Sequence, residues 1–367
     1  MDAGLMSKQV VIVGAGVVGC LIAKVLKKHD IPFKILEKNK EIRKDPRRTV
    51  ALTSDSIKFL NSLEKELDLN AWATPVERMH LYQKSDLNLV LESKEEKKVT
   101  SICLLDDLHE KIISSLDSDI LWDEDIKNIG LGSNLQIKTQ KNEFTADLLF
   151  ATDGMNSNVR KLMHFDTEEW FYGQKAYVAV VRANHKNIAK QYFSKFGTLA
   201  LLPLSKDKEY YSIILCTNST SNADEQLKSL NEEFNLSLDL EGIELGSGFE
   251  LKHVRAKKMF KDRILLSGDA ANSFHPMAGQ GLNLGIGDVM HIDRNIDQLI
   301  EMNSSTLEAY NSSRNQKNIQ MTWIIQSLYG IFGNAEGLGE KIIESGMKFL
   351  DRIPSIKEKI IEFANKN

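Results

Sequence analysis

Apolar residues near the start of the chain form two short runs separated by a longer stretch with helical spacing. Val10–Val13 is a continuous β-branched run, typical of a parallel strand that is buried on both faces. Residues 20–28 then place leucine and valine on one side and three lysines elsewhere, which predicts a helix. Residues 31–36 form a second apolar run, which is followed by Glu37. The pattern predicts one complete βαβ unit.

The spacing of apolar positions changes several times along the rest of the chain. Residues 38–48 are strongly charged and carry Pro46, which favours a loop. Helical spacing recurs at residues 53–67, 106–116, 223–235 and beyond Gly281. Short strand patterns between turn residues occupy residues 76–91, 120–150, 177–181, 198–203, 210–216 and 264–266.

This order of elements predicts an α/β fold in which a Rossmann-like, dinucleotide-binding domain is interrupted by an antiparallel-sheet domain. The segments assigned to the dinucleotide-binding domain are residues 7–75, 101–167 and 261–300. Residues 76–100 and 168–260 are assigned to the inserted sheet domain, which is expected to bind the substrate. Residues 301–367 form a helical C-terminal region, and residues 1–6 are interpreted as a tail.

Composition excludes several classes of protein. Lys and Arg total 47 against 51 Asp and Glu, so the basic excess of a nucleic-acid-binding protein is missing. The three cysteines lie far apart, without the spacing of a disulfide framework or a zinc site, which favours a reducing cytoplasm and no metal. The longest charge-free apolar stretch, residues 10–23, has 14 residues, too few to cross a bilayer. No small-residue cleavage site follows a basic leader.

A G-x-G-x-x-G pattern lies between the first predicted strand and helix. Gly14 permits the tight turn, Gly16 lets the backbone approach a pyrophosphate, and Gly19 allows close helix–strand packing. Glu37 comes 18 residues after Gly19 and can accept hydrogen bonds from ribose hydroxyls. The candidate cofactor-binding residues here are Gly14, Gly16, Val17, Val18, Gly19, Glu37 and Lys38. The motif predicts a bound dinucleotide but does not by itself distinguish FAD from NAD.

A second region favours FAD. A predicted strand leads into Gly268-Asp269, a proline-containing loop follows, and a helix opens near Gly281. Asp269 can bond a ribityl hydroxyl, and the N-terminus of the helix can stabilise the negative charge of a reduced flavin. The candidate residues are Asp269, Gly279, Gln280, Gly281, Leu282 and Asn283. Between the two regions, Asp153-Gly154 follows a predicted strand with turn chemistry, and Asp153 is a further candidate.

These three motifs, in this order, resemble the single-component FAD-dependent aromatic hydroxylases. The segment G-D-A-A-x-x-x-H-P-x-A-G-Q-G-x-N-L-G at residues 268–285 is similar to the ubiquinone-biosynthesis hydroxylases, which act on 2-polyprenylphenol or 2-polyprenyl-6-methoxyphenol. The resemblance spans nearly the whole chain, from R-x-x-A-L at residues 48–52 to Y-x-x-x-R at 310–314 and L-D-R-I-P at 350–354. It implies an FAD-binding domain of the glutathione-reductase/p-hydroxybenzoate-hydroxylase type.

Some positions depart from the family pattern. Asn272 stands where the family usually has His, Gly287 where it often has Arg, and Ala151 where it usually has Gly. Residues 102–106 lack a polar residue that the family often places near the flavin. These departures concern individual contacts rather than the fold.

The resemblance also implies a mechanism. NADPH or NADH would reduce the flavin and leave, and reduced FAD would react with O2 to give a C4a-hydroperoxide that oxidises a phenol ring. Arg48, Asp153 and Arg160 would lie near the pyrophosphate and the path of the reductant. Pro276 would lie beside the reactive flavin edge, and His275 would help to shape the oxygen site. No side-chain base is assigned, and His275 can equally be a packed loop histidine.

The implied substrate is a small phenol with a hydrophobic tail. Val178, Val180, Leu201 and Leu215 could line its cavity, although each could also be a core residue. Residues 341–367 carry a net charge of +2 on an amphipathic pattern, which fits peripheral contact with the inner face of a membrane. The same pattern fits packing on the chain's own domain or on a partner in a biosynthetic complex.

Two alternatives remain at this point. A flavin hydroxylase of a soluble aromatic acid would need a basic residue in its pocket, for which Arg182 and Arg255 are candidates. A non-catalytic scaffold or lipid-binding subunit of the same fold would bind no flavin. The sequence leaves the oligomeric state open.

Overall fold

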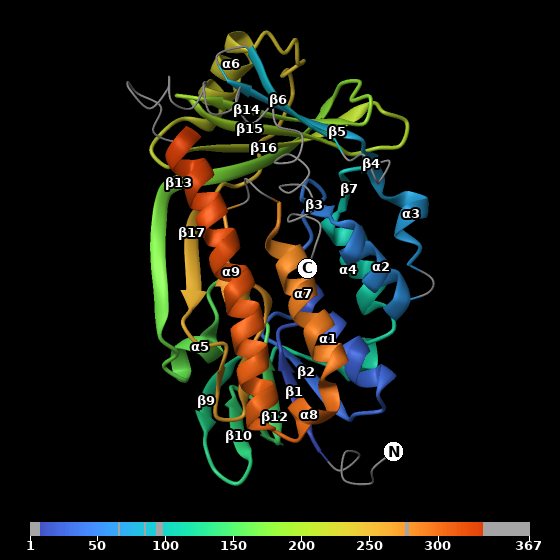
Figure 1. The fold of residues 1–367 in the computed structure, drawn as a ribbon, viewed down its shortest axis with the longest axis vertical. Helices are drawn as coiled ribbons and strands as arrows, with labels where there is room; N and C mark the ends of the chain where they lie inside the picture. The colour runs from blue at the N-terminus through green and yellow to red at the C-terminus, as the bar shows by residue number, and fades with distance from the viewer. Residues whose placement is uncertain (1–7, 65–66, 84–85, 93–97, 276–278, 333–367) are drawn as a thin grey trace.

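The computed structural model describes residues 8–64, 67–83, 86–92, 98–275 and 279–332 of the chain. Within these residues the strands form four sheets. Figure 1 shows the largest sheet across one end of the molecule, with one very long strand, β13 (Thr167–Arg182), descending along its side. The helix α9 (Ser304–Phe332) runs beside the helix α7 (Gly281–Arg294), and the two are in contact.

A six-stranded sheet carries the predicted βαβ unit. Its order is β18 (Phe260–Lys261), β19 (Ile264–Leu266), β12 (Leu148–Ala151), β1 (Val10–Val13), β2 (Phe33–Glu37) and β8 (Ile120–Trp122). All neighbours pair in parallel except the edge strand β18. Every residue of β1 is buried, as expected for a strand covered on both faces. Segments from three distant parts of the sequence therefore meet in this sheet, as the predicted order of elements requires.

The first helix begins earlier than its apolar spacing predicts. The helix α1 spans Val17–Lys28, so its first turn lies inside the glycine motif. Gly16 precedes it in an extended conformation, with φ −70° and ψ 175°, and provides no side-chain cap. The helix begins three residues before the predicted start at residue 20. The prediction rested on apolar spacing, and Val17 and Val18 were assigned to the glycine motif instead. The N–H groups of the first turn have no carbonyl partner within the helix.

The predicted helix over residues 53–67 is two shorter helices. The helix α2 (Ser54–Leu63) is capped by Thr53, whose hydroxyl accepts a hydrogen bond from Ser56 N, and α3 (Leu69–Trp72) follows. A three-stranded sheet lies beside them, in the order β3 (Thr49–Leu52), β7 (Thr100–Leu104) and β4 (Thr74–Val76). The helix α4 (Leu105–Ile113) follows β7 and packs on α1.

Residues 120–162 add a small sheet and a short helix. The sheet consists of β9 (Ile126–Gly130), β10 (Leu135–Thr139) and β11 (Glu143–Ala146), and α5 (Asn158–Leu162) packs against β9. A 3-10 turn at Asp117–Asp119 precedes β8, and another forms at Gly268–Ala270 after β19.

The eight-stranded sheet is built mainly from the segments predicted to form the sheet domain. Its order is β20 (Asn272–Ser273), β17 (Phe249–Ala256), β13, β16 (Tyr210–Asn218), β15 (Gly197–Pro203), β14 (Ile188–Ser194), β5 (Arg78–Gln83) and β6 (Asp86–Glu92). The antiparallel pairing of β5 with β6 confirms the hairpin predicted within residues 76–91. The strand β14 was missed because its sequence, IAKQYFS, does not alternate cleanly between apolar and polar residues.

The two faces of this sheet have different neighbours. On the outer face, Leu199, Leu201 and Leu215 pack with Leu227 and Leu230 of the helix α6 (Ala223–Glu233) in one buried core. The opposite face, called the inner face here, carries Met79, Ala189 and Leu202, which pack against the β3–β7–β4 sheet. Because side chains alternate along a strand, Val178 and Val180 belong to the inner face. Leu201 and Leu215 therefore fill the core instead of lining the inner face.

The C-terminal part of the described chain is helical. The helix α8 (Ile296–Ile300) follows α7 and is followed by α9. None of the helices in the described ranges combines the length and apolar character needed to cross a membrane. The amphipathic pattern at residues 341–367 and the motif at 350–354 lie outside the described residues. Cys20, Cys103 and Cys216 are buried and carry free thiols.

Candidate functional site

The glycine motif forms a tight turn with one open position. Gly14 has φ +99°, and a Cβ there would lie 2.7 Å from Thr152 O. A Cβ at Gly19 would overlap the carbonyl oxygen of Gly14 and come within 2.6 Å of Thr152 Oγ1. In contrast, a Cβ at Gly16 would meet no atom within 4 Å. Gly14 and Gly19 are therefore required by the protein's own packing, whereas Gly16 borders free space.

Side chains from distant segments hold this turn in place. Ala15 N donates to Glu37 Oε2 over 2.9 Å, and Ala15 O lies 2.7 Å from His109 Nε2. Thr152 Oγ1 donates to the carbonyl oxygens of Val13 and Gly14. Burial lowers the pKa of His109, which favours the neutral ring with Nε2–H as the donor. Sequence reasoning missed His109 and Thr152, because only the fold brings them to the motif.

Glu37 is the last residue of β2 and is buried. Its Oε1 accepts from the backbone and side-chain amides of Asn39, at 2.9 and 2.6 Å. A carboxylate has about four lone-pair sites, so these three hydrogen bonds leave acceptor capacity for a ribose. Lys38, the next residue, is exposed.

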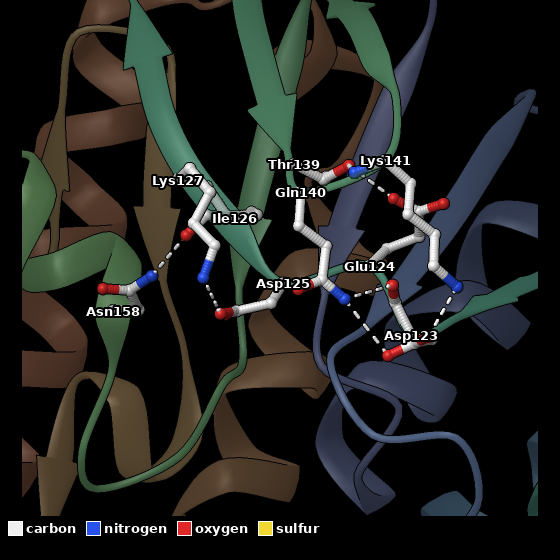
Figure 2. A network of polar contacts seen from close by, with 9 residues as sticks. All are labelled: Asp123, Glu124, Asp125, Ile126, Lys127, Thr139, Gln140, Lys141 and Asn158. Carbon is white, nitrogen blue, oxygen red and sulfur yellow. Dashed lines mark hydrogen bonds and ion pairs between the residues drawn. The ribbon is translucent and has the colours of Figure 1, made fainter.

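A polar network secures the end of β2 and the start of α5 (Figure 2). The segment at residues 123–127 bonds to residues 139–141, including the ion pair of Asp123 with Lys141 and the hydrogen bond from Gln140 to Asp123. Glu124 N donates to Glu37 O, and Asn158 Nδ2 donates to Ile126 O. The network thus joins the strand that carries Glu37 to the helix that follows Asp153.

The Asp153 turn has an unsatisfied polar atom. Asp153 Oδ2 accepts hydrogen bonds from the backbone N–H groups of Asn158 and Val159, at 2.7 and 3.1 Å. Asp153 Oδ1 is buried and has no hydrogen-bond partner within the described chain. Arg160 is buried, and its Nη1 donates to Ala270 O over 2.7 Å. Arg160 therefore joins this turn to the Gly268–Ala270 turn.

The second glycine-rich region packs directly on the first. A Cβ at Gly268 would lie 3.0 Å from a methyl group of Val18, and one at Gly285 would lie 2.7 Å from the same side chain. Val18 therefore fills the space between the Gly268 turn and α7. As a result, the N-terminal ends of α1 and α7, which are more than 260 residues apart in sequence, lie in one site.

Asp269 lies in the Gly268–Ala270 turn, close to the first residue of α7. A Cβ added at Gly281 would be 3.8 Å from Asp269 Oδ1. The side chain is accessible to solvent, yet surrounding protein desolvates the carboxyl and raises its pKa to about 6, with Arg48 opposing and Asp288 adding to the rise. Arg48 is exposed and forms no ion pair with the described residues.

Asn283 connects α7 to the β3–α2 corner. Its Oδ1 accepts from Thr53 N and Ser56 Oγ, at 3.0 and 2.8 Å, and its Nδ2 donates to Ala51 O over 2.8 Å. The Asn283 carboxamide is therefore engaged with protein groups. Gly279 has φ +59°, and Gln280 and Leu282 are partly exposed beside it.

His275 is packed against the long strand β13. Its ring lies edge-on to Tyr172, with centroids 4.8 Å apart, and its Nε2 is 3.2 Å from Gln174 Oε1. Burial lowers the pKa of His275 to about 4, so the ring is neutral near pH 7. Pro276, the other residue expected to shape the oxygen site, lies outside the described residues.

These features fit a flavin dinucleotide. The helices α1 and α7 begin at Gly16 and Gln280 without a side-chain cap, as α3, α4 and α8 also do. Uncapped N-termini leave N–H groups and a positive dipole end for an anionic ligand. Gly16 borders open space, and Asp153 Oδ1 lacks a partner within the described chain. Together they define a dinucleotide-binding protein.

Comparison with known proteins identifies the family. The chain belongs to the FAD binding domain family, whose profile matches residues 7–322. Its cofactor is therefore FAD, as the second glycine-rich region predicts.

Curated relatives match part of the chain. Ubiquinone biosynthesis monooxygenase COQ6, mitochondrial, from Danio rerio is 26% identical over 269 residues, covering 60% of this chain and 55% of the relative. Ubiquinone hydroxylase UbiL from Rhodospirillum rubrum is 27% identical over 205 residues, covering 52% of this chain and 47% of that protein. The chain spans about half the length of the curated relatives it matches.

Solved structures match almost the whole chain. The p-nitrophenol 4-monooxygenase PnpA from Pseudomonas putida gives a TM-score of 0.82 at 17% identity and covers 98% of this chain and 99% of that one. Klebsiella pneumoniae HpxO complexed with FAD and uric acid gives 0.80 at 14% identity, covering 98% of this chain and 97% of that one. These similarities confirm the predicted α/β fold of the p-hydroxybenzoate-hydroxylase type.

Proposed function

We propose that this chain is an FAD- and NAD(P)H-dependent monooxygenase that hydroxylates the ring of a polyprenylated phenol in ubiquinone biosynthesis, with O2 as the oxygen source. The family match supports a flavoprotein, and the names of the COQ6 and UbiL relatives support the pathway. Because the chain spans about half of those relatives, the substrate is a proposal that rests on its own site.

The observation that carries the proposal is the uncharged centre of the inner face of the eight-stranded sheet. In the described strands β13 to β16, this centre carries Val178, Val180, Ala189, Gln191, Ala200, Leu202, Ser212 and Ile214, and Arg182 lies on the same face at the end of β13. An aromatic carboxylate bound there would need a cation, because burying an unpaired charge is costly. The two candidate cations are engaged elsewhere: Arg182 pairs with Glu209 at the exposed end of β13, and Arg255 pairs with Glu168. A neutral phenol suits this face better than a soluble aromatic acid.

Each part of the site has a proposed task. FAD, when bound, supplies the chemistry of oxygen activation and ring hydroxylation. The turn at Gly14, Gly16, Val17, Val18 and Gly19 binds the pyrophosphate, and Glu37 with Lys38 binds the adenosine side. Arg48, Asp153 and Asp269 bind the remaining phosphate and ribityl groups. Gly279, Gln280, Gly281, Leu282 and Asn283 form the N-terminus of α7 that faces negative charge on the flavin. Pro276 and His275 shape the oxygen side, and the sheet excludes water.

Domain organisation and localisation belong to the same proposal. The FAD-binding domain comprises residues 7–75, 101–167 and 261–300, the substrate domain residues 76–100 and 168–260, and the C-terminal region residues 301–367. A cytoplasmic enzyme that contacts the inner face of a membrane through residues 341–367 would reach a substrate with a polyprenyl tail. Co-sedimentation with liposomes, compared between the full chain and one lacking residues 341–367, tests this contact. Equal sedimentation of two folded proteins would contradict it.

Purified chain reconstituted with FAD tests the proposed activity. We expect an absorbance band near 450 nm, which is typical of a bound flavin, and NAD(P)H oxidation that a short-chain prenylphenol stimulates more than hydroxybenzoates do. Stimulation only by hydroxybenzoates would support a hydroxylase of soluble aromatic acids. A colourless protein would support a scaffold and overturn the proposal. Cells lacking the chain should accumulate a prenylated quinone precursor.

A further inference from the structure

Gln191 is a polar residue in the uncharged centre of the inner face of the sheet. It lies at the centre of β14, where Ala200 of β15 and Leu81 of β5 are its partners in register. Ala189 and Phe193, two residues before and after it, point to the same face and are buried. Gln191 is partly exposed between them. The space in front of this part of the sheet is therefore accessible at Gln191.

The Gln191 carboxamide has no hydrogen-bond partner among the described residues. The nearby hydroxyl on the same face, that of Ser212, is fully buried and bonds to Thr49 Oγ1 at 3.0 Å. In-register neighbours Ala200 and Leu81 offer no side-chain polar group. Two N–H donors and one carbonyl acceptor of Gln191 are therefore available to a molecule bound against this face.

Ala51 connects this face to the candidate flavin site. It packs on the buried cluster of Val76, Ile102 and Ala189, against which Leu202 of the sheet also packs. On the other side, a Cβ at Gly279 would lie 3.4 Å from Ala51 Cβ, and Ala51 O accepts from Asn283 Nδ2. Ala51 therefore borders the start of α7 and belongs to the packing that includes Ala189, two residues before Gln191.

We propose that Gln191 recognises the oxygen substituent of the substrate ring and so orients the ring toward the flavin. The inference rests on the proposed function and assigns a specificity-determining residue to it. A neutral amide can donate to a phenol or methoxy oxygen and accept from a phenol O–H, without attracting a carboxylate. A site built to hydrogen-bond an oxygen rejects an analogue that lacks it, because the buried polar group is left unpaired.

Binding measurements with two matched probes test the proposal. The probes are 2-geranylphenol and geranylbenzene, which differ only in the ring hydroxyl. Their dissociation constants are measured from the change in flavin absorbance of the FAD-loaded chain. We expect Gln191→Met, which keeps the size but removes the amide, to weaken binding of the phenol by about three- to tenfold. Binding of geranylbenzene should stay unchanged.

Gln136→Met is the matched control, because Gln136 is an exposed residue of β10 in a different sheet. It should bind both probes like the unaltered chain. Gln191→Asn serves as a second variant that stays polar, and its shorter side chain should also lose preference for the phenol. Retained flavin absorbance in both variants shows that they are folded.

The outcomes separate the two proposals. If the unaltered chain prefers the phenol and both Gln191 variants keep that preference, Gln191 is not the recognition residue and the proposed function stands. Equal weakening of both probes would mean that Gln191 acts through packing, which also overturns the inference. If the unaltered chain binds FAD but neither probe, the proposed substrate class is wrong and the role of Gln191 falls with it.

Discussion

At the scale of single residues, the glycine motif separates residues needed for folding from a residue that faces a ligand. The surroundings of Gly14 and Gly19 are filled by backbone atoms and Thr152, whereas the surroundings of Gly16 are empty. The sequence pattern treats the three glycines alike. Only the packing shows which of them the protein needs in the absence of FAD.

This difference predicts opposite effects for two alanine substitutions. Gly16→Ala should leave the thermal stability of the apoprotein unchanged and weaken FAD binding by about tenfold or more, because its methyl group enters the space of the pyrophosphate. Gly19→Ala should lower the free energy of unfolding of the apoprotein by about 1–3 kcal/mol, because its methyl group meets the Gly14 carbonyl. Thermal denaturation without FAD, followed by FAD titration, distinguishes them. A destabilised Gly16→Ala apoprotein would contradict this assignment.

Residue-level prediction is most direct where the chemistry is local. Gly14, Gly19 and Glu37, the last residue of β2, follow from turn geometry and strand length. His109 and Thr152 contact the same turn from residues about 90 and 140 positions away, and no spacing rule connects them to it. The roles of the candidate cofactor-binding residues themselves stay predictions.

At the scale of elements, a buried ion pair holds the start of α7 in position. Arg314 of α9 donates to Asp288 Oδ1 through Nε over 2.7 Å and to Leu284 O through Nη2 over 2.9 Å. Asp288 Oδ2 accepts from Gly268 N, so the pair also fixes the turn that precedes Asp269. A Cβ at Gly287 would lie 2.5 Å from Arg314 Nη2. Gly287, which departs from the family pattern, therefore makes room for the guanidinium.

We predict that Arg314→Gln lowers the free energy of unfolding by about 3–5 kcal/mol, because it leaves Asp288 buried without a counter-ion. The double variant Arg314→Gln/Asp288→Asn should lose less than the sum of the two single variants. Glu308→Gln, which breaks an exposed ion pair of the same helix with Lys258, should cost less than about 1 kcal/mol. The free energy of unfolding of the four variants and of the unaltered chain is measured by chemical denaturation. Additive losses would show that the two buried groups act independently.

The boundaries of elements were predicted less well than their order. The helix predicted over residues 53–67 ends at Leu63 because the chain turns into a second helix that begins at Leu69. The strand β14 was not predicted, because its pairing with β15 and β5, rather than an alternation of apolar and polar residues in its own sequence, selects its conformation. Apolar spacing gives the type of an element, but caps and neighbours decide where it starts and stops.

At the scale of the whole molecule, buried histidines make stability depend on pH. Burial is the main cause of a lowered pKa for six of the eight histidines, namely His80, His109, His185, His253, His275 and His291. A base with a lowered pKa in the folded state binds fewer protons than in the unfolded state, so stability falls as pH drops below about 6.5. Asp269, whose pKa is raised to about 6, acts in the opposite sense between about pH 4 and 6.

His275 provides the clearest test of this dependence. Its pKa of about 4, against about 6.5 when unfolded, corresponds to about 3 kcal/mol that is lost between pH 6.5 and 4. We predict that His275→Gln is less sensitive to acid over this range than the unaltered chain. Urea denaturation at several pH values gives the free energy of unfolding of both proteins. The difference between these free energies at each pH removes the contribution of the groups that the two proteins share. Parallel stability curves would show that His275 is charged in the folded state.

The overall arrangement was predicted from the order of motifs, but the faces of the sheet were not. Val178, Val180, Leu201 and Leu215 look equivalent in sequence, and strand register divides them between the inner face and the α6 core. Register depends on pairing between distant strands. The uncharged centre of the inner face therefore became visible only in the fold.

The placement of the three cysteines gives the molecule an intrinsic set of chemical reporters. Cys20 lies in α1, Cys103 in β7 of the three-stranded sheet, and Cys216 in β16 of the eight-stranded sheet, and burial raises the pKa of each thiol to about 12. Thiol reagents attack the thiolate, so each site becomes reactive only when its own part of the structure opens. Mass-resolved alkylation could then time the opening of each region separately, without any engineered label.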